Sequence, residues 1–181
     1  MKNRYILYLL VSYVIFFNVN FAIANEFEFN VSEIIISEKG NITKAKKGTA
    51  RSLTDGININ ANTFLYNKKK STLTTLGDVE ITNIKNNFLI KTQGIIYDTY
   101  KKEILSEKNM LIKDEEGNIA QAEGFFLNLN SSIVKLKKMR MVDLQQNIIK
   151  LDVAFINLNT KKLIGKDVSI SLNNKTFNKD N

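Results

Sequence analysis

The sequence predicts an all-β protein built from repeated antiparallel units. Four nine-residue segments align without gaps, and their starts are 31, 30 and 29 residues apart. From Phe27 onward, apolar and polar residues alternate with the period of a half-buried strand. No stretch after the N-terminal region keeps apolar residues at helical spacing for three turns. A fixed period of this kind indicates one supersecondary unit whose copies stack to share a core.

The first 24 residues have the features of a secretory signal peptide. Lys2 and Arg4 form a basic start, Ile6–Phe17 is a compact apolar run, and Ala22-Ile23-Ala24 offers the small residues that a signal peptidase reads. A membrane anchor is the competing interpretation, but the apolar run is shorter than the ~20 residues of a spanning helix. We therefore expect a signal peptide over 1–24, one domain over 25–174 and a polar tail over 175–181.

Each repeat contains two apolar stretches that are separated by a polar turn. The first stretches are Ile59–Asn67, Ile90–Asp98, Ala120–Asn128 and Ile149–Asn157, and the second are Leu73–Ile81, Ile104–Ile112, Val134–Val142 and Leu163–Ile170. Clusters that favour tight turns punctuate them, namely Lys39-Gly40-Asn41, Asp55-Gly56, Gly77-Asp78, Glu116-Gly117-Asn118 and Gly165-Lys166-Asp167. This pattern predicts about a dozen short strands.

Composition excludes several kinds of chemistry. The chain has no cysteine and no histidine, so disulfides, thiolate or imidazole metal sites and Ser-His or Cys-His dyads are absent. The carboxylates Glu26/Glu28 and Asp114-Glu115-Glu116 are more simply explained as solvated charge than as acid–base pairs. Removal of Lys2 and Arg4 lowers the formal net charge from +8 to +6. We predict a basic exported protein that is not an enzyme and needs no metal or cofactor, with nucleic acid the least expected partner.

The dry positions are mainly Ile, Leu, Val, Met and Phe, and they recur at the same phase in every unit. The pattern describes an apolar trough along the stack. From periodicity alone, the simpler interpretation is the filled core of an ordinary β-sandwich.

Three features together resemble a known family. The mature chain opens with Phe29–Ile42 (FNVSEIIISEKGNI), its units close on Tyr66-Asn67 and Tyr97-Asp98, and these lead into Gly77–Ile81 (GDVEI). With the signal peptide, this order resembles the lipopolysaccharide-transport periplasmic domain, also called the organic-solvent-tolerance domain. The resemblance covers about Phe29 to Leu172. The opening segment Phe29–Lys39 looks most like the N-terminal domain of the family's outer-membrane assembly protein.

The resemblance implies an open antiparallel β-jelly roll, folded like a taco, in the periplasm. It implies that the interior shelters the acyl chains of lipopolysaccharide and that modules join edge to edge. An outer-membrane barrel is a further partner within the family. The chain is expected to be either a fragment of a barrel-containing protein or a stand-alone bridge protein. The groove residues expected on this basis are Ile59, Phe64, Val79, Ile81, Ile90, Ile95, Met110, Ile112, Phe126, Met139, Met141, Phe155, Val168 and Ile170.

The edges of the sheet are expected to be docking surfaces, because strand addition relies on main-chain hydrogen bonds. The expected partner edge is the opening strand, with Val31, Glu33, Ile35 and Ser37, and Val168–Leu172 forms the other edge. Lysines recur in the predicted turns at Lys68–Lys70, Lys101-Lys102, Lys137-Lys138 and Lys161-Lys162. They either meet phosphates of a glycolipid or keep exposed strands from pairing indiscriminately, and the second interpretation is favoured.

A different class of function stays open beside lipid transport. An exported structural or adhesive β-repeat protein predicts a filled core and no lipid uptake.

Overall fold

The computed structural model describes residues 26–83, 88–113 and 117–173. The predicted signal peptide and tail, and the acidic cluster 114–116, lie outside the described residues. The strands are β1 (Phe27–Ser37), β2 (Ile42–Ser52), β3 (Ile57–Asn67), β4 (Thr72–Asn83), β5 (Phe88–Asp98), β6 (Glu103–Ser106), β7 (Met110–Lys113), β8 (Ile119–Ala122), β9 (Gly124–Asn128), β10 (Ile133–Val142), β11 (Ile148–Asn157) and β12 (Leu163–Ser171).

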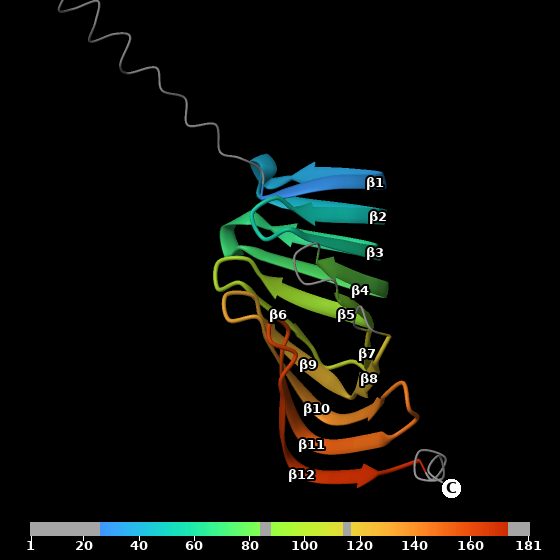
Figure 1. Ribbon diagram of the computed structural model, residues 1–181. Coiled ribbons are helices and arrows are strands. Elements are labelled where there is room, and N and C mark those ends of the chain that lie inside the picture. The colour runs from blue at the N-terminus through green and yellow to red at the C-terminus, as the bar shows by residue number, and fades with distance from the viewer. Residues whose placement is uncertain (1–25, 84–87, 114–116, 174–181) are drawn as a thin grey trace, which may run out of the picture.

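These strands form one antiparallel meander with β1 at one end and β12 at the other (Figure 1). Short strands replace long ones in the middle of the stack. Both β6 and β7 pair with β5, and both β8 and β9 pair with β10, so each couple takes the place of one interrupted strand. Two 3₁₀ turns, η1 (Glu38–Gly40) and η2 (Lys68–Lys70), join β1 to β2 and β3 to β4. No helix in the described part of the chain is long and apolar enough to cross a membrane.

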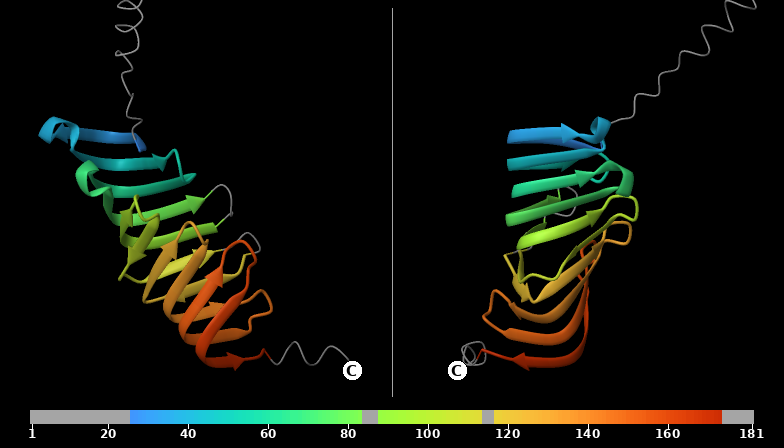
Figure 2. Two further views of the ribbon diagram at one scale, coloured as in Figure 1. Left: turned by 90° about the vertical axis from the view of Figure 1, so that its left-hand side faces the viewer. Right: turned by 180° about the vertical axis from the view of Figure 1, so that it is seen from behind.

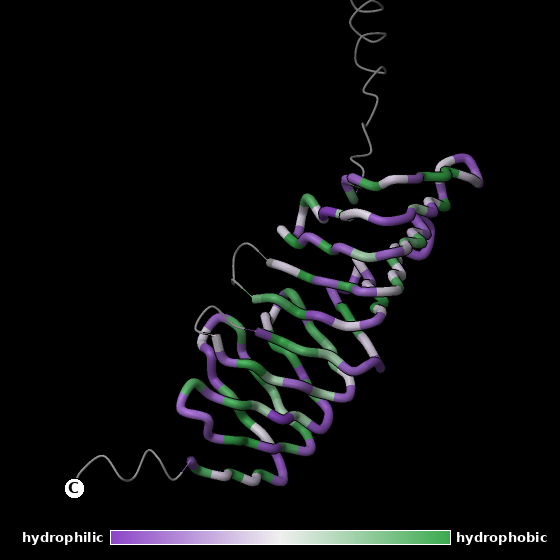
Figure 3. Tube along the Cα trace, turned by 90° about the vertical axis from the view of Figure 1, so that its right-hand side faces the viewer, coloured by the Kyte–Doolittle hydropathy of each residue, from purple (hydrophilic) through white to green (hydrophobic). Residues whose placement is uncertain are grey.

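Most of the long strands change the face that they bury near their midpoint. In β3, Ile57, Ile59 and Ala61 are buried, and the next buried residues are Phe64 and Tyr66. The register of the β3–β4 pair shifts at the same place. Because side chains alternate between the two faces of a strand, one extra residue exchanges the faces. The strand can therefore bend there and still keep apolar side chains on the inside of both halves, as the alternating colours of Figure 3 illustrate.

The bend is marked by residues with positive φ. Lys47, Asp78, Lys138 and Asp167 lie inside β2, β4, β10 and β12 with φ between 45° and 56°. The predictions that Gly77-Asp78, Gly165-Lys166-Asp167 and Lys137-Lys138 form turns are therefore wrong. The reason is that a turn and a mid-strand bend demand the same backbone conformation, so the sequence signal is shared. The turns predicted at Lys39-Gly40-Asn41 and Asp55-Gly56 are confirmed.

The bend divides the sheet into two layers that lie across one another (Figure 2). We call them arm A and arm B. The inner row of arm A follows the strand pairing through Phe29, Ala50, Ile59, Ile81, Ile90, Ile112, Ala120, Met141, Ile149 and Ile170. An inner row of arm B runs through Ile36, Thr43, Tyr66, Leu73, Tyr97, Ile104, Leu127, Val134, Ile156 and Leu163.

The core fills the space between these rows. Phe27 of arm A packs edge-on against Tyr66 of arm B, with ring centroids 5.1 Å apart, and Phe29 packs against Phe64 at 6.0 Å. The all-β prediction is confirmed, and the period of the repeat corresponds to two bent strands.

Gly48 tests the close approach of strands at the bend. Its φ is +151°, and a Cβ there would clash with the backbone oxygen of Asn30 in β1. We expect Gly48→Ala to lower the free energy of unfolding by about 2–4 kcal/mol, measured by urea denaturation. Gly40→Ala is the control, because Gly40 also has positive φ but its Cβ would meet no atom within 4 Å. Equal losses in the two variants would show that the close approach is not a constraint.

Candidate functional site

The candidate site is the inner face of the bent sheet. Nine of the predicted groove residues lie there with exposed fractions of 6% or less. They are Ile59, Phe64, Val79, Ile81, Ile90, Ile95, Met110, Ile112 and Met139. Met141 is half-buried against the same core. The strand pairing therefore brings residues from all four repeats to one surface, as the alternation predicted.

This interior is packed with the protein's own side chains from β2 to β10. The largest fully buried side chains come from both arms and include Tyr97, Ile59, Leu73 and Leu136. Side chains with so little exposed surface leave no room for an acyl chain beside them. The expectation of a vacant trough along the whole stack is therefore wrong for this segment. Alternation identifies the dry face, but it does not tell whether that face is covered by the opposite arm.

At the β12 end the inner face is open. Val168 pairs with Leu151 and Ile170 pairs with Ile149, so both point to the inside of arm A. Leu151 is only 4% exposed, whereas Val168 and Ile170 are 54% and 57% exposed. These two predicted groove residues therefore lie on the inner face as expected, but water covers them.

The β1 end is open on the other arm. Ile34 pairs with the buried Ala45, and Ile36 pairs with the buried Thr43, so both belong to the inner face of arm B. Both side chains are nevertheless exposed. Sequence reasoning missed them because it continued the alternation of Val31 past the bend of β1. The run of three isoleucines, which places an apolar residue on each face whatever the phase, was the available signal.

An offset between the two arms explains these open ends. The start of β1 in arm A contacts β3 in arm B, where the Tyr66 hydroxyl donates to Glu26 Oε2 at 2.6 Å. The turn after β2 contacts β5, where the Tyr97 hydroxyl donates to Asp55. Each level of arm A is thus covered by a level of arm B that comes two or three strands later. Arm B of β1 and arm A of β12 consequently face no opposite layer within the described residues.

Asp55 holds the arms together by electrostatics. Its Oδ2 accepts hydrogen bonds from Tyr97, from Lys102 Nζ at 2.9 Å and from Ser52 Oγ at 3.0 Å. Burial alone would raise the pKa of Asp55, but these hydrogen bonds outweigh burial and hold the pKa below its ordinary value. Burial and the bond to Asp55 raise the pKa of Tyr97, and burial and the bond to Glu26 raise that of Tyr66. Both phenols therefore stay protonated donors.

Two groove predictions are wrong. Phe126 pairs with Lys135, and so does Phe155, whose ring lies 5.8 Å from Lys135 Nζ, so both aromatic rings lie on the outer face. The sixth residue of each nine-residue segment faces inward, as Phe64 and Ile95 do, and the corresponding residues here are Phe125 and Ala154. The larger side chain at the seventh position was mistaken for the core residue in both units.

The predicted partner edge lies on an edge strand, because β1 pairs only with β2. Val31 packs partly against the core, while Glu33 and Ile35 point to the outer face and Ser37 ends the strand. Glu33 forms an exposed ion pair with Lys46 at 2.8 Å. The opposite edge is β12, as expected.

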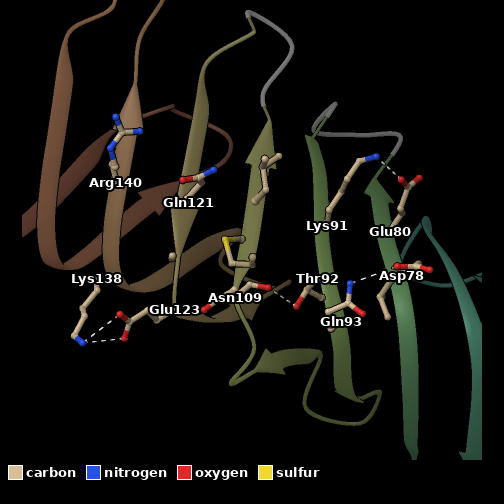
Figure 4. A pocket seen from close by; sticks show the side chains of 14 residues that line it. Asp78, Glu80, Lys91, Thr92, Gln93, Asn109, Gln121, Glu123, Lys138 and Arg140 are labelled. Carbon is tan, nitrogen blue, oxygen red and sulfur yellow. Dashed lines mark hydrogen bonds and ion pairs between the residues drawn. The ribbon is translucent and has the colours of Figure 1, made fainter.

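A polar hollow of about 810 Å³ lies on the outer face, over β4, β5, β7, β8 and β10 (Figure 4). Its charged side chains are largely paired. Lys91 forms an ion pair with Glu80, and Lys138 Nζ lies 3.0 Å from Glu123 Oε2. Among the described residues, no group of three or more acidic, His or Cys side chains could hold a metal ion. The hollow therefore presents a solvated, nearly neutral surface rather than a set of catalytic groups.

Comparison with known proteins shows the fold. No family model matches the chain, and no curated protein matches it by sequence. Among solved structures, the chain is similar to LptH of Pseudomonas aeruginosa, the LptA-homologous periplasmic component of the conserved lipopolysaccharide transport device. The TM-score is 0.56 at 10% identity, and the match covers 65% of this chain and 94% of LptH. The fold is the LptA-type β-jelly roll. The fold class predicted from the resemblance is thereby confirmed.

Asp55 should make stability depend on pH in acid. Its pKa in the folded protein lies below the ordinary value of 3.8, so its contribution is complete above that pH and is lost as the pH falls through the folded pKa. We expect Asp55→Asn to lower the free energy of unfolding at neutral pH by about 1–3 kcal/mol and to flatten its decline in acid. Chemical denaturation over a pH series measures both effects.

Two tyrosines provide the control for this experiment. Tyr97→Phe removes a donor to Asp55 and should weaken the same acid transition, whereas Tyr100→Phe should not, because Tyr100 is 85% exposed. An unchanged acid transition in Asp55→Asn would contradict the assigned role.

Proposed function

We propose that this protein is a periplasmic lipid-binding module of lipopolysaccharide transport. Its fold is that of LptH, a component of such a device in another organism. Its sequence carries the features of a cleavable signal peptide. The proposed ligand is lipopolysaccharide, bound through its acyl chains, and the proposed partners are other modules of the same fold and an outer-membrane barrel.

One observation carries this proposal: the inner face of β12 is apolar and exposed. Val168 and Ile170 continue a row of side chains that is buried in the preceding strands. Leu172, two residues further on, is also exposed. Each methylene that a guest chain buries here contributes ~0.8 kcal/mol. The contact has no directional component, so an acyl chain can slide along it.

The packed interior limits where lipid can bind first. Acyl chains can reach Val168, Ile170 and the half-buried Ile149 and Met141 without moving either arm. Deeper residues such as Ile112 become accessible only when the arms separate. We therefore place the first lipid contact at the β12 end, with deeper entry conditional on the contacts of Asp55 and Glu26.

The packed interior also favours a second candidate function. An exported structural β-repeat protein needs a filled core and no ligand, and the segment from β2 to β10 meets that description. The exposed inner faces at both ends would then serve assembly alone.

Site-specific photo-crosslinking in living cells separates the two candidates. A photoreactive residue in place of Ile170 should give lipopolysaccharide adducts, because this side chain lies on the open inner face. The matched control is Ser169, its neighbour on the opposite face of the same strand. A probe at Ile112 reports on deeper entry.

Adducts at Ile170 but not at Ser169 would support lipid binding. Equal labelling of both positions, or no adducts at either Ile170 or Ile112, would contradict it and favour the structural protein.

The two open ends also suggest how modules join. The β1 end exposes the inner face of arm B, and the β12 end exposes the inner face of arm A. A module placed with its β1 against β12 of another would continue the sheet, and the offset between the arms would cover both exposed faces. This arrangement is a heterologous, head-to-tail contact.

Substitutions on β1 test this docking. Ile36→Lys places a charge on the inner face and should weaken association by about tenfold or more, because the charge would be buried on docking. Ile35→Lys is the control, since Ile35 points to the outer face of the same strand. Sedimentation velocity or in-cell crosslinking between modules measures the effect. An Ile36→Lys protein that associates as well as Ile35→Lys would contradict the model.

A further inference from the structure

The outer face of arm B carries a continuous apolar row. Strand pairing aligns Ile35, Leu65, Ile96, Leu105, Phe155 and Ile164 across the sheet, with Phe126 between Leu105 and Lys135. The six first-named side chains are 37% to 69% exposed. Lys44, Thr74 and Lys135 are the polar members of the row.

The matching row of arm A provides an internal comparison. It runs through Asn60, Glu80, Lys91, Gln121 and Lys150, and Leu111 is its apolar member. Both rows belong to the same strands, lie on the same side of the sheet and occupy equivalent places beside the bend. The fold itself therefore does not require apolar residues on the outer face of arm B. Contiguous exposed apolar residues of this kind mark a surface that meets another apolar phase.

Lysines border the apolar row on its outer side. The turns of arm B carry Lys39, Lys68–Lys70, Lys101, Lys102, Lys161 and Lys162, against a single acidic residue, Glu38. Lys102 is engaged with Asp55, and Lys101 lies 3.5 Å from Asp98. The three consecutive lysines of η2 have no acidic partner among the described residues.

Cationic side chains also stand within the row. Lys135 extends over the ring of Phe155. Near β1, a hollow of about 320 Å³ has the apolar side chains of Ile35, Leu65 and Leu76 around Lys44 and Lys46. Apolar side chains thus alternate with ammonium groups whose long stems can lie along an apolar surface while the charge stays in water.

We infer that the outer face of arm B is a peripheral binding surface for an anionic phospholipid membrane. Apolar and aromatic side chains enter the boundary between headgroups and acyl chains, and the lysines of the turns meet the phosphates. Charge complementarity decides for this partner over a second copy, because lysine-bordered faces of two copies would repel each other. Because the sheet twists, a flat bilayer meets one part of the row at a time.

This surface is independent of lipid binding in the interior. Side chains on the outer face do not reach the inner rows, so either proposal can fail without the other. Vesicles that contain no lipopolysaccharide keep the two experiments separate.

Vesicle flotation tests the inference. The protein, purified at the length found in cells, should float with vesicles of phosphatidylcholine and phosphatidylglycerol, and added salt should release it. The combined substitution Leu65→Thr, Ile96→Thr and Phe155→Thr should weaken binding by about tenfold or more, since threonine suits strands but lacks the apolar surface. Lys68→Gln, Lys69→Gln and Lys70→Gln together should have an effect of similar size.

Matched controls come from the outer face of arm A. Leu111→Thr and the pair Arg140→Gln and Lys150→Gln should bind like the unchanged protein, and thermal unfolding verifies that every variant folds. Absence of binding to anionic vesicles at low salt overturns the inference, as does an equal loss in the arm A controls. A dimer that the threonine variant dissociates, without any vesicle binding, also overturns it and assigns the face to a second copy.

Discussion

A strand that folds back over itself must exchange the faces it buries at the bend, and the interior of this protein depends on that exchange. Without it, the apolar residues of one half would point to water, because side chains alternate strictly. The exchange takes place within one or two residues, at backbone conformations such as those of Lys47 and Asp78. It recurs at neighbouring places along the stack, so the bends line up and two layers form. Both the packed core and the two different outer faces follow from this alignment.

The offset between the layers links the fold to its proposed use. Glu26 with Tyr66, and Asp55 with Tyr97, join levels of the sheet that are two or three strands apart. A stack of finite length must then leave half a layer uncovered at each end, and on opposite arms. These surfaces are apolar because the repeat continues to the last strand. A single molecule therefore exposes the same kind of surface that it buries in its middle, and either a lipid chain or another module can cover it.

Sequence patterns predicted the strands well because period-two alternation is local. Nine of the fourteen groove residues are buried as expected, and the edges fall on β1 and β12. Phe155 was misplaced because Ala154, the true inward residue, is too small to stand out. The turn predicted at Gly77-Asp78 failed because a bend and a turn need the same backbone. The offset between the arms could not be predicted, since it rests on contacts between residues about forty positions apart, such as Asp55 and Tyr97.

A packed interior and a lipid path are compatible when the exchange of contacts is nearly balanced. Parting the arms breaks a few hydrogen bonds to charged groups, each worth about 1.5–3 kcal/mol. It also exposes apolar side chains, but an acyl chain covers them again at ~0.8 kcal/mol per methylene. The Thr75 hydroxyl, buried without a hydrogen-bond partner, shows that this core is not optimised for stability alone. The polar contacts of Asp55 and Glu26 therefore set the cost of opening, while the apolar surface between the arms can serve either as core or as path.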